Sequence, residues 1–127
     1  MRKLAPRIAM LAGVLLVAIG LAAPATAHHG WGAYGDTQVE LTGTLVTPVS
    51  LAGPHGTAQI SVDEQVWDLV FAPSARTARA GLTEDAIPVG DEVTVSGHRH
   101  LDPENFEMKV ERLTWNGEVF NVYPDRN

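Results

Sequence analysis

The residues best suited to chemistry in this chain are its five histidines, which fall into three short groups. His28 and His29 are adjacent, His55 stands alone, and His98 and His100 are separated by one residue. The chain has no cysteine, so thiolate metal sites and thiol catalysis are excluded. A site built from imidazole and amine nitrogens alone indicates Cu(II) as the first metal and Zn(II) as the second.

The first 27 residues have the three parts of a secretory signal peptide. Three basic residues within the first seven positions precede an apolar run over residues 8–22, and residues 25–27 are Ala-Thr-Ala. We therefore expect cleavage after Ala27, a periplasmic or secreted location, and no membrane span in the mature chain. An uncleaved anchor is the alternative, for which the apolar run is short.

Cleavage after Ala27 would leave His28 at a free N-terminus. Its α-amine and imidazole could then chelate one ion, and His29 would add a second imidazole. The pKa of an unperturbed α-amine is about 8, so metal binding at neutral pH would release a proton. The alternative is a terminus whose sequence only suits the signal peptidase.

The composition after residue 27 is that of one acidic domain. The whole chain has 127 residues, with nine Lys and Arg and fifteen Asp and Glu. Three of the basic residues and none of the acidic ones lie in the first 27 positions, so the remaining 100 residues carry a net charge of −9. This length suits a single domain with one core. The charge argues against nucleic acid as a partner, because it repels phosphate backbones.

Period-two alternation of apolar and polar residues predicts five strands. Between the third and the fourth, Ser74 is expected to cap a short helix over residues 75–80, which Gly81 ends. Residues 28–37 are expected to form an N-terminal arm, followed by a single domain over residues 38–127. The strands are expected over residues 38–47, 58–62, 66–71, 92–100 and 106–111, with a short terminal strand over 119–123.

This order of elements predicts an all-β fold, a small five-stranded Greek-key barrel of the OB-fold type with one short helix between strands three and four. A different small barrel or a sandwich could use the same strands. In an OB-fold, the loops between strands one and two and between strands four and five flank the ligand-binding face. His55 lies in the first of these loops, and His98 and His100 enter the second. Trp31 and Tyr34 are expected to pack across the barrel and hold the arm near this end.

His98 and His100 are two residues apart on the fourth predicted strand, so their side chains point to the same side. They share the parity of Thr94 and Ser96, which predicts an outward-facing, exposed pair. A bulge at Gly97 would reverse this parity. Such a pair can hold one ion, but an exposed pair that binds nothing is an equally good interpretation.

Several short motifs along the chain occur together in one known family. They are the Ala27–Tyr34 segment, the Pro54-His55 pair, the Val89–Gly97 segment and the ending Val122–Arg126. In these motifs the chain resembles the family of short secreted bacterial proteins known only as domain of unknown function 6152. The resemblance covers nearly all of the mature chain and implies export and a small β-fold. It brings no established activity.

We therefore expect an exported, non-enzymatic metal-binding protein, with copper first and zinc second. His28, His29 and His55 are the expected main ligands, and His98 and His100 are secondary ones. The alternative is an OB-fold module that binds a small organic ligand or another envelope protein, with the histidines incidental. An enzyme is not expected, because the sequence has no Gly-x-Ser-x-Gly elbow and no phosphate loop.

Overall fold

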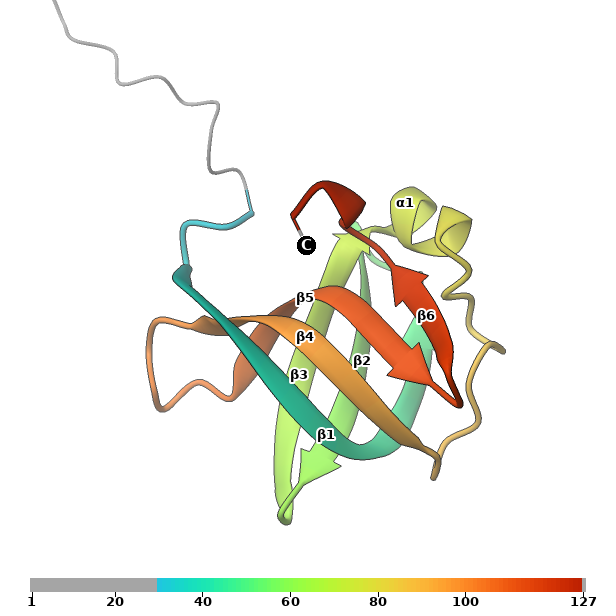
Figure 1. The fold of residues 1–127 in the computed structure, drawn as a ribbon, viewed down its shortest axis with the longest axis horizontal. Coiled ribbons are helices and arrows are strands. Elements are labelled where there is room, and N and C mark those ends of the chain that lie inside the picture. The colour runs from blue at the N-terminus through green and yellow to red at the C-terminus, as the bar shows by residue number, and fades with distance from the viewer. Residues whose placement is uncertain (1–29, 127) are drawn as a thin grey trace, which may run out of the picture.

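The structure, a computed structural model, describes residues 30–126 (Figure 1). The predicted signal peptide, its cleavage site, His28 and His29 lie outside the described residues. The elements follow the predicted order, with a helix between the third and fourth strands and a short final strand. They are β1 (Tyr34–Ser50), β2 (His55–Val62), β3 (Gln65–Pro73), α1 (Ser74–Arg79), β4 (Glu92–His100), β5 (Glu107–Trp115), β6 (Glu118–Asn121) and the 3₁₀ turn η1 (Pro124–Arg126).

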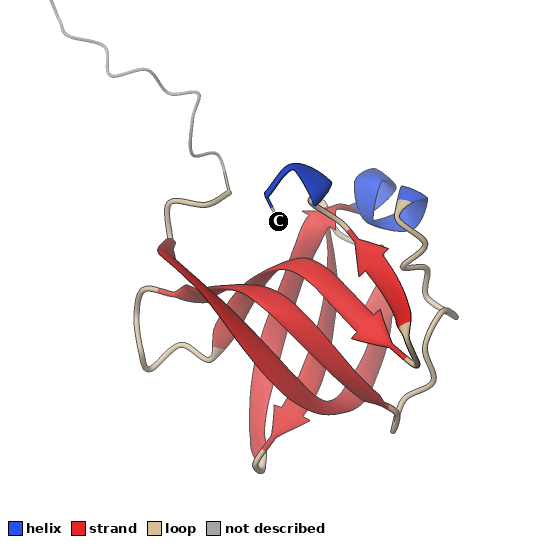
Figure 2. Ribbon diagram, viewed as in Figure 1, coloured by secondary structure: helices blue, strands red, loops and turns tan. Residues whose placement is uncertain are grey.

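The strands curl into a closed barrel (Figure 2). Hydrogen-bonded neighbours follow the order β3-β2-β1-β4-β5-β6, and β3 also pairs in parallel with β5 to close the ring. Strands 1 to 5 with a helix between β3 and β4 are the five-stranded OB-fold barrel, so the predicted fold class is confirmed. The sixth strand extends the sheet beyond β5 through a tight hairpin, in which Asn116 (φ 48°) and Gly117 (φ 76°) both take the left-handed conformation.

The barrel interior is filled by the apolar side chains of the period-two pattern. Leu45, Ile60, Leu69, Val95 and Val110 have no exposed surface, and each comes from a different strand of the barrel. Their polar neighbours in sequence point to the outer face, as the alternation of a strand requires. The core is therefore made of the residues that the alternation predicted.

The first strand is longer than predicted at both ends. It begins at Tyr34, inside the segment expected to be an arm, because the chain from Tyr34 onward pairs with β4, starting opposite His100. It also continues to Ser50, through Pro48, which was expected to begin a loop. Pro48 has no N–H to donate, and it lies where the pairing with β2 shifts register, so no ladder hydrogen bond is lost.

The helix begins differently from the prediction. Ser74 was expected to cap it, but Pro73 holds the cap position and no side chain makes a cap hydrogen bond. The Ser74 hydroxyl instead donates to the carbonyl oxygen of Gly53 at 2.6 Å, which ties the helix to the loop between β1 and β2. Gly81 follows the helix with φ +97°, the left-handed conformation predicted for its C-terminal stop.

A β-bulge interrupts β5 at Glu111. Ser96 of β4 pairs with Arg112 and Gly97 pairs with Val110, so Glu111 is the extra residue on the bulged strand. Beyond the bulge the alternation restarts with the opposite parity, and Leu113 enters the core. The bulge removes Glu111 from the regular ladder.

Replacing Gly97 by alanine should destabilise the protein by about 3 kcal/mol. A Cβ at this position would overlap the backbone carbonyl of Lys109 on the adjacent strand, and the backbone cannot move aside as a flexible side chain could. Urea unfolding of both proteins measures the change. Gly53→Ala is the control, because the nearest atom to its Cβ is the His55 oxygen at 3.8 Å, and it should cost less than about 0.5 kcal/mol. Equal stability of the two variants would contradict the predicted clash.

Candidate functional site

His55 is the first residue of β2, where its backbone pairs with Pro73. The ring is half-buried, and burial, together with the positive charge of the nearby Lys109, lowers its pKa below the usual value for histidine. Both causes favour the neutral imidazole, which is the form that binds metal ions. His55 is therefore the histidine among the described residues whose environment best suits a ligand role.

Lys109 is a buried cation at this end of the barrel. The residue is 2% exposed, and its Nζ lies 5.6 Å from the ring centre of Trp31 and 5.8 Å from that of Tyr123. Burial lowers the pKa of Lys109, and the charge of Glu107 partly opposes the shift. Sequence reasoning missed this residue, because Lys109 occupies a polar position of an alternating strand.

The segment Gly30–Ala33, which we call the entry segment, lies across the same end of the molecule. A Cβ built on Gly30 would be 3.7 Å from Lys109 Nζ. Trp31 packs edge-on against His98 at 5.6 Å and against Tyr123 at 5.1 Å between ring centres. The predicted packing of Trp31 across the barrel is confirmed, and it fixes the entry segment beside Lys109.

His98 was predicted to be exposed, and that prediction is wrong, because the residue is only 8% exposed. It does lie on the outer face, opposite Lys109 on β5, but the entry segment covers that face. Its Nδ1 lies 2.8 Å from the carbonyl oxygen of Gly35, and its Nε2 lies 2.7 Å from Oε1 of Glu111. Both partners are oxygen atoms, so both ring nitrogens are engaged and neither is free for a metal ion.

His100 is partly engaged. Its Nδ1 accepts a hydrogen bond from the backbone N–H of Asp102 at 3.0 Å, and its ring packs edge-on against Tyr34 at 5.7 Å. Only Nε2 is left for another ligand. No group of three or more His, Asp or Glu side chains arranged for a metal ion occurs in the part of the chain that the structure describes. The structure therefore does not join His55, His98 and His100 into one ligand set.

Glu111 is the centre of a buried polar network that the sequence analysis missed. Its carboxylate has no exposed surface and accepts from His98 Nε2, from Gln38 Nε2 at 2.9 Å and from Arg126 Nε at 3.4 Å. The guanidinium group of Arg126 also lies 3.9 Å from the ring centre of Trp31. The network thus holds the entry segment and η1 against β4 and β5. No local sequence pattern marks a bulge, so Glu111 looked like an ordinary outward-facing residue.

Tyr34 and Glu107, both half-buried, form a second contact beside Lys109. The Tyr34 hydroxyl donates to Oε1 of Glu107 at 3.0 Å, and Asn105 Nδ2 donates to Oε2 at 3.2 Å. Burial, and next the negative charge of Glu107, raise the pKa of Tyr34 well above its usual value. Tyr34 is therefore a neutral donor at physiological pH, and Glu107 has an N–H or O–H donor on each oxygen.

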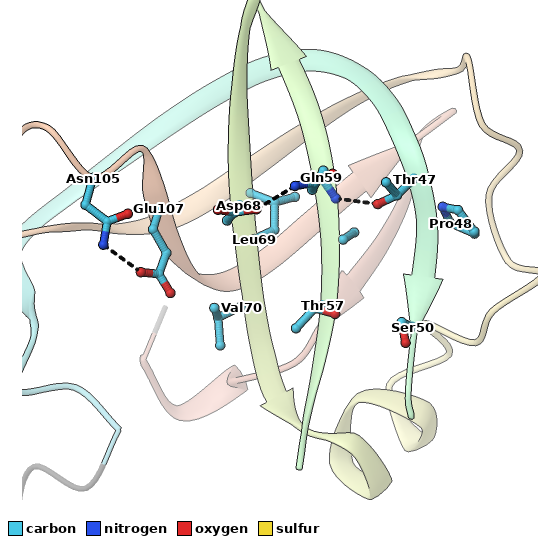
Figure 3. A pocket seen from close by; sticks show the side chains of 11 residues that line it. Thr47, Pro48, Ser50, Thr57, Gln59, Asp68, Leu69, Val70, Asn105 and Glu107 are labelled. Carbon is cyan, nitrogen blue, oxygen red and sulfur yellow. Dashed lines mark hydrogen bonds between the residues drawn. The ribbon is translucent and has the colours of Figure 1, made fainter. Parts of the chain in front are cut away.

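A groove of about 720 Å³ lies on the outer face of β1, β2 and β3 (Figure 3). This is the face that OB-folds commonly use for ligands. Its polar side chains bond mainly to one another, since Gln59 Nε2 donates to Asp68 Oδ1 at 2.7 Å and the Gln59 backbone N–H donates to Thr47 Oγ1 at 2.9 Å. Asp68 and Glu107, paired across β3 and β5, give the groove an acidic character.

No curated protein matches the sequence. Two solved structures of the tRNA agmatidine synthetase TiaS resemble part of this chain, one of the apo form and one of the complex with tRNA, AMPCPP and agmatine. Each is 16% identical in sequence, with a TM-score of 0.47, and the match covers 61% of this chain and 18% of that chain. A ZRD-deleted mutant of TiaS with agmatine is 15% identical with a TM-score of 0.48, covering 67% of this chain and 26% of that one. The chain thus spans about a fifth to a quarter of these proteins, and likeness at this level carries no argument about function.

Two further observations concern the chain as a whole. No helix within residues 30–126 is long and apolar enough to cross a membrane. The sequence profile described as "Family of unknown function (DUF6152)" matches residues 15–108, which is most of the chain. The chain therefore belongs to this family, as its motifs indicated.

Proposed function

We propose that this protein is exported, loses residues 1–27, and binds a metal ion outside the cytoplasm, copper in the first place and zinc in the second. The ligands are His28, with its α-amine and imidazole, His29 and His55. The observation that carries the proposal is the position of Gly30. It lies beside Lys109 Nζ, and the charge of that same ammonium acts on His55.

The chain length between Gly30 and the histidines supports this ligand set. His28 is two residues before Gly30, and two residues span at most about 7 Å. A new N-terminus at His28 would therefore be within about 7 Å of Gly30, which lies beside Lys109 Nζ. An amine and up to three imidazole nitrogens suit Cu(II), which heads the affinity order of the divalent first-row metals and accepts a tetragonal arrangement.

The strand-four histidines take a smaller part in this proposal than the sequence indicated. His98 leaves the ligand set, because Gly35 and Glu111 engage both of its ring nitrogens. His100 keeps Nε2 and stays a secondary candidate. Substitution of His100 should therefore change copper affinity less than substitution of His55.

Copper affinity should rise with pH, by about tenfold per unit between pH 6 and pH 8. The α-amine, with a pKa of about 8, must lose its proton to bind, whereas His55 is already neutral at pH 7 because its pKa is lowered. The nearby Lys109 ammonium opposes a second cation. Protein that begins at His28 is titrated with copper against a chelator of known affinity, and EPR counts the nitrogen ligands. Weak binding without fixed stoichiometry at every pH would overturn the proposal.

The groove on β1–β3 favours a second candidate function, a module that binds a small organic ligand. The observation behind it is a concave, polar, acidic surface on the usual ligand face of the fold. A ligand there should shift the amide resonances of Thr57, Gln59 and Asp68 in an NMR titration of metal-free protein. Perturbations confined to the entry segment and His55 would instead favour the metal site.

A further inference from the structure

Two rows of residues cross the barrel at the groove on its outer face (Figure 3). Each row takes one residue from each of β1, β2, β3 and β5, and each residue is the register partner of the next. The first row is Thr47, Gln59, Asp68 and Glu107, and the second is Ser50, Thr57, Val70 and Lys109. Neighbouring strands lie about 4.8 Å apart, so a row spans about 14 Å. The register of these four strands therefore decides which groups a ligand in the groove meets.

The two ends of the groove differ in their chemistry. The carboxylates of Asp68 and Glu107 lie at the end formed by β3 and β5. At the other end, β1 and β2 contribute three hydroxyl side chains, those of Thr47, Ser50 and Thr57. Among the described residues that line the groove there is no Lys, Arg or His. A ligand in the groove therefore lies against two negative groups at one end and neutral hydrogen-bonding groups at the other.

Asp68 is the carboxylate best placed to bind a ligand. Its side chain is exposed, and the hydrogen bond from Gln59 Nε2 at 2.7 Å uses Oδ1, which orients the carboxylate and leaves Oδ2 for a ligand. Glu107 is half-buried, and each of its oxygens already accepts a hydrogen bond. Its charge also acts on Lys109, which is 2% exposed, so the two charges partly offset each other. Attraction of a positive group to the groove therefore depends mainly on Asp68, and Glu107 adds to it.

We propose that the groove binds a small organic cation, a protonated primary amine on an aliphatic chain, with its ammonium group at Asp68 and Glu107. This inference rests on the second candidate function, ligand binding in the groove, and names its ligand class. The ammonium group donates to Asp68 Oδ2, and charge-assisted hydrogen bonds of this kind are the strong ones. A ligand of about 10 Å reaches from Asp68 across β2 to the hydroxyl groups of β1, two strand spacings away. The net charge of −9 after residue 27 attracts cations of this kind to the protein.

The test is an NMR titration of the whole mature, metal-free protein at neutral pH with butylamine, butanol and butyrate in turn. The three probes share one alkyl chain and differ in the charge of the head group, and ionic strength is held constant. We expect butylamine to shift the amide resonances of Thr57, Gln59 and Asp68 saturably, and the other two probes to bind at least about tenfold more weakly. Equal binding of butanol or butyrate overturns the cation class and leaves the second candidate function in place. Absence of saturable shifts with butylamine also overturns the proposal, and the second candidate function then survives only if another probe shifts the same amides.

Substitutions assign the site. Asp68→Asn keeps the shape of the side chain and an acceptor oxygen without the charge, and it should weaken butylamine binding at least about tenfold. Glu107→Gln should weaken it several-fold, and it keeps the proposal testable if the Asp68 variant does not fold. Asp63→Asn is the matched control, because it changes the net charge equally at an exposed turn between β2 and β3, outside the groove lining. Unchanged affinity in the folded Asp68 and Glu107 variants, or an equal loss in the Asp63 variant, would overturn the assignment.

Discussion

Acetylation of the α-amine of His28 should weaken copper binding by about a hundredfold, or about 2.7 kcal/mol. The acetyl group turns this amine into an amide, so the chelate between amine and imidazole is lost while every side chain remains. It adds no new amine at the terminus. Competition with a chelator of known affinity measures both proteins under the same conditions.

The controls for this prediction separate the terminus from the barrel. Amidation of the carboxylate of Asn127 modifies the other terminus and should leave copper affinity unchanged. His55→Ala in the correctly processed protein should weaken binding by about tenfold, and His100→Ala should weaken it less. If acetylation has no effect, the α-amine is not a ligand, and the proposed function loses its main chelating group.

The fold class could be predicted because each strand of the barrel is marked by its own alternation of apolar and polar residues. In β2, Ala58 and Ile60 alternate with Gln59 and Ser61, and the structure buries the first pair in the core. The same period-two pattern in the other strands, with one helix after the third, leaves few small barrels to choose from. Register and strand ends are set by pairing between distant segments, so the start of β1 at Tyr34 was not visible in its own sequence.

The surroundings of the histidines were harder to predict, because parity indicates only the face on which a side chain lies. His98 does lie on the outer face, as its parity indicated, but Trp31 packs over it. Whether a distant segment covers an outer face depends on contacts far apart in the sequence. The same covering explains why Lys109 and Glu111, both polar residues at outward positions, are buried.

His55 is a different case. The Gly-Pro loop before it indicated an accessible side chain near the barrel end, and the structure places it at the start of β2 beside Lys109. The sequence could not show the neighbouring charge, because Lys109 is more than fifty residues away along the chain. That charge bears on the proposed metal site, because it opposes a second cation.

Replacing Glu111 by alanine should destabilise the protein by about 3 kcal/mol. The carboxylate is fully buried and accepts from His98, Gln38 and Arg126, so its removal leaves the buried Nε2 of His98 without a partner. It also releases Arg126, which packs on Trp31. Glu111→Gln keeps an acceptor oxygen and should cost about 1 kcal/mol. Urea unfolding at pH 7 measures each variant, and Glu118→Ala, at an exposed position of β6, should change stability by less than about 0.5 kcal/mol.

A double-mutant cycle tests whether His98 and Glu111 act as a pair. If they do, the double variant with His98→Ala and Glu111→Ala loses less unfolding free energy than the two single variants lose together. The second substitution then removes a group that the first had left without a partner. Losses that simply add would show that the 2.7 Å contact contributes no stability of its own. If the losses are less than additive, the contact with His98 gives the bulge at Glu111 a physical reason, because a fully buried carboxylate needs hydrogen-bond donors.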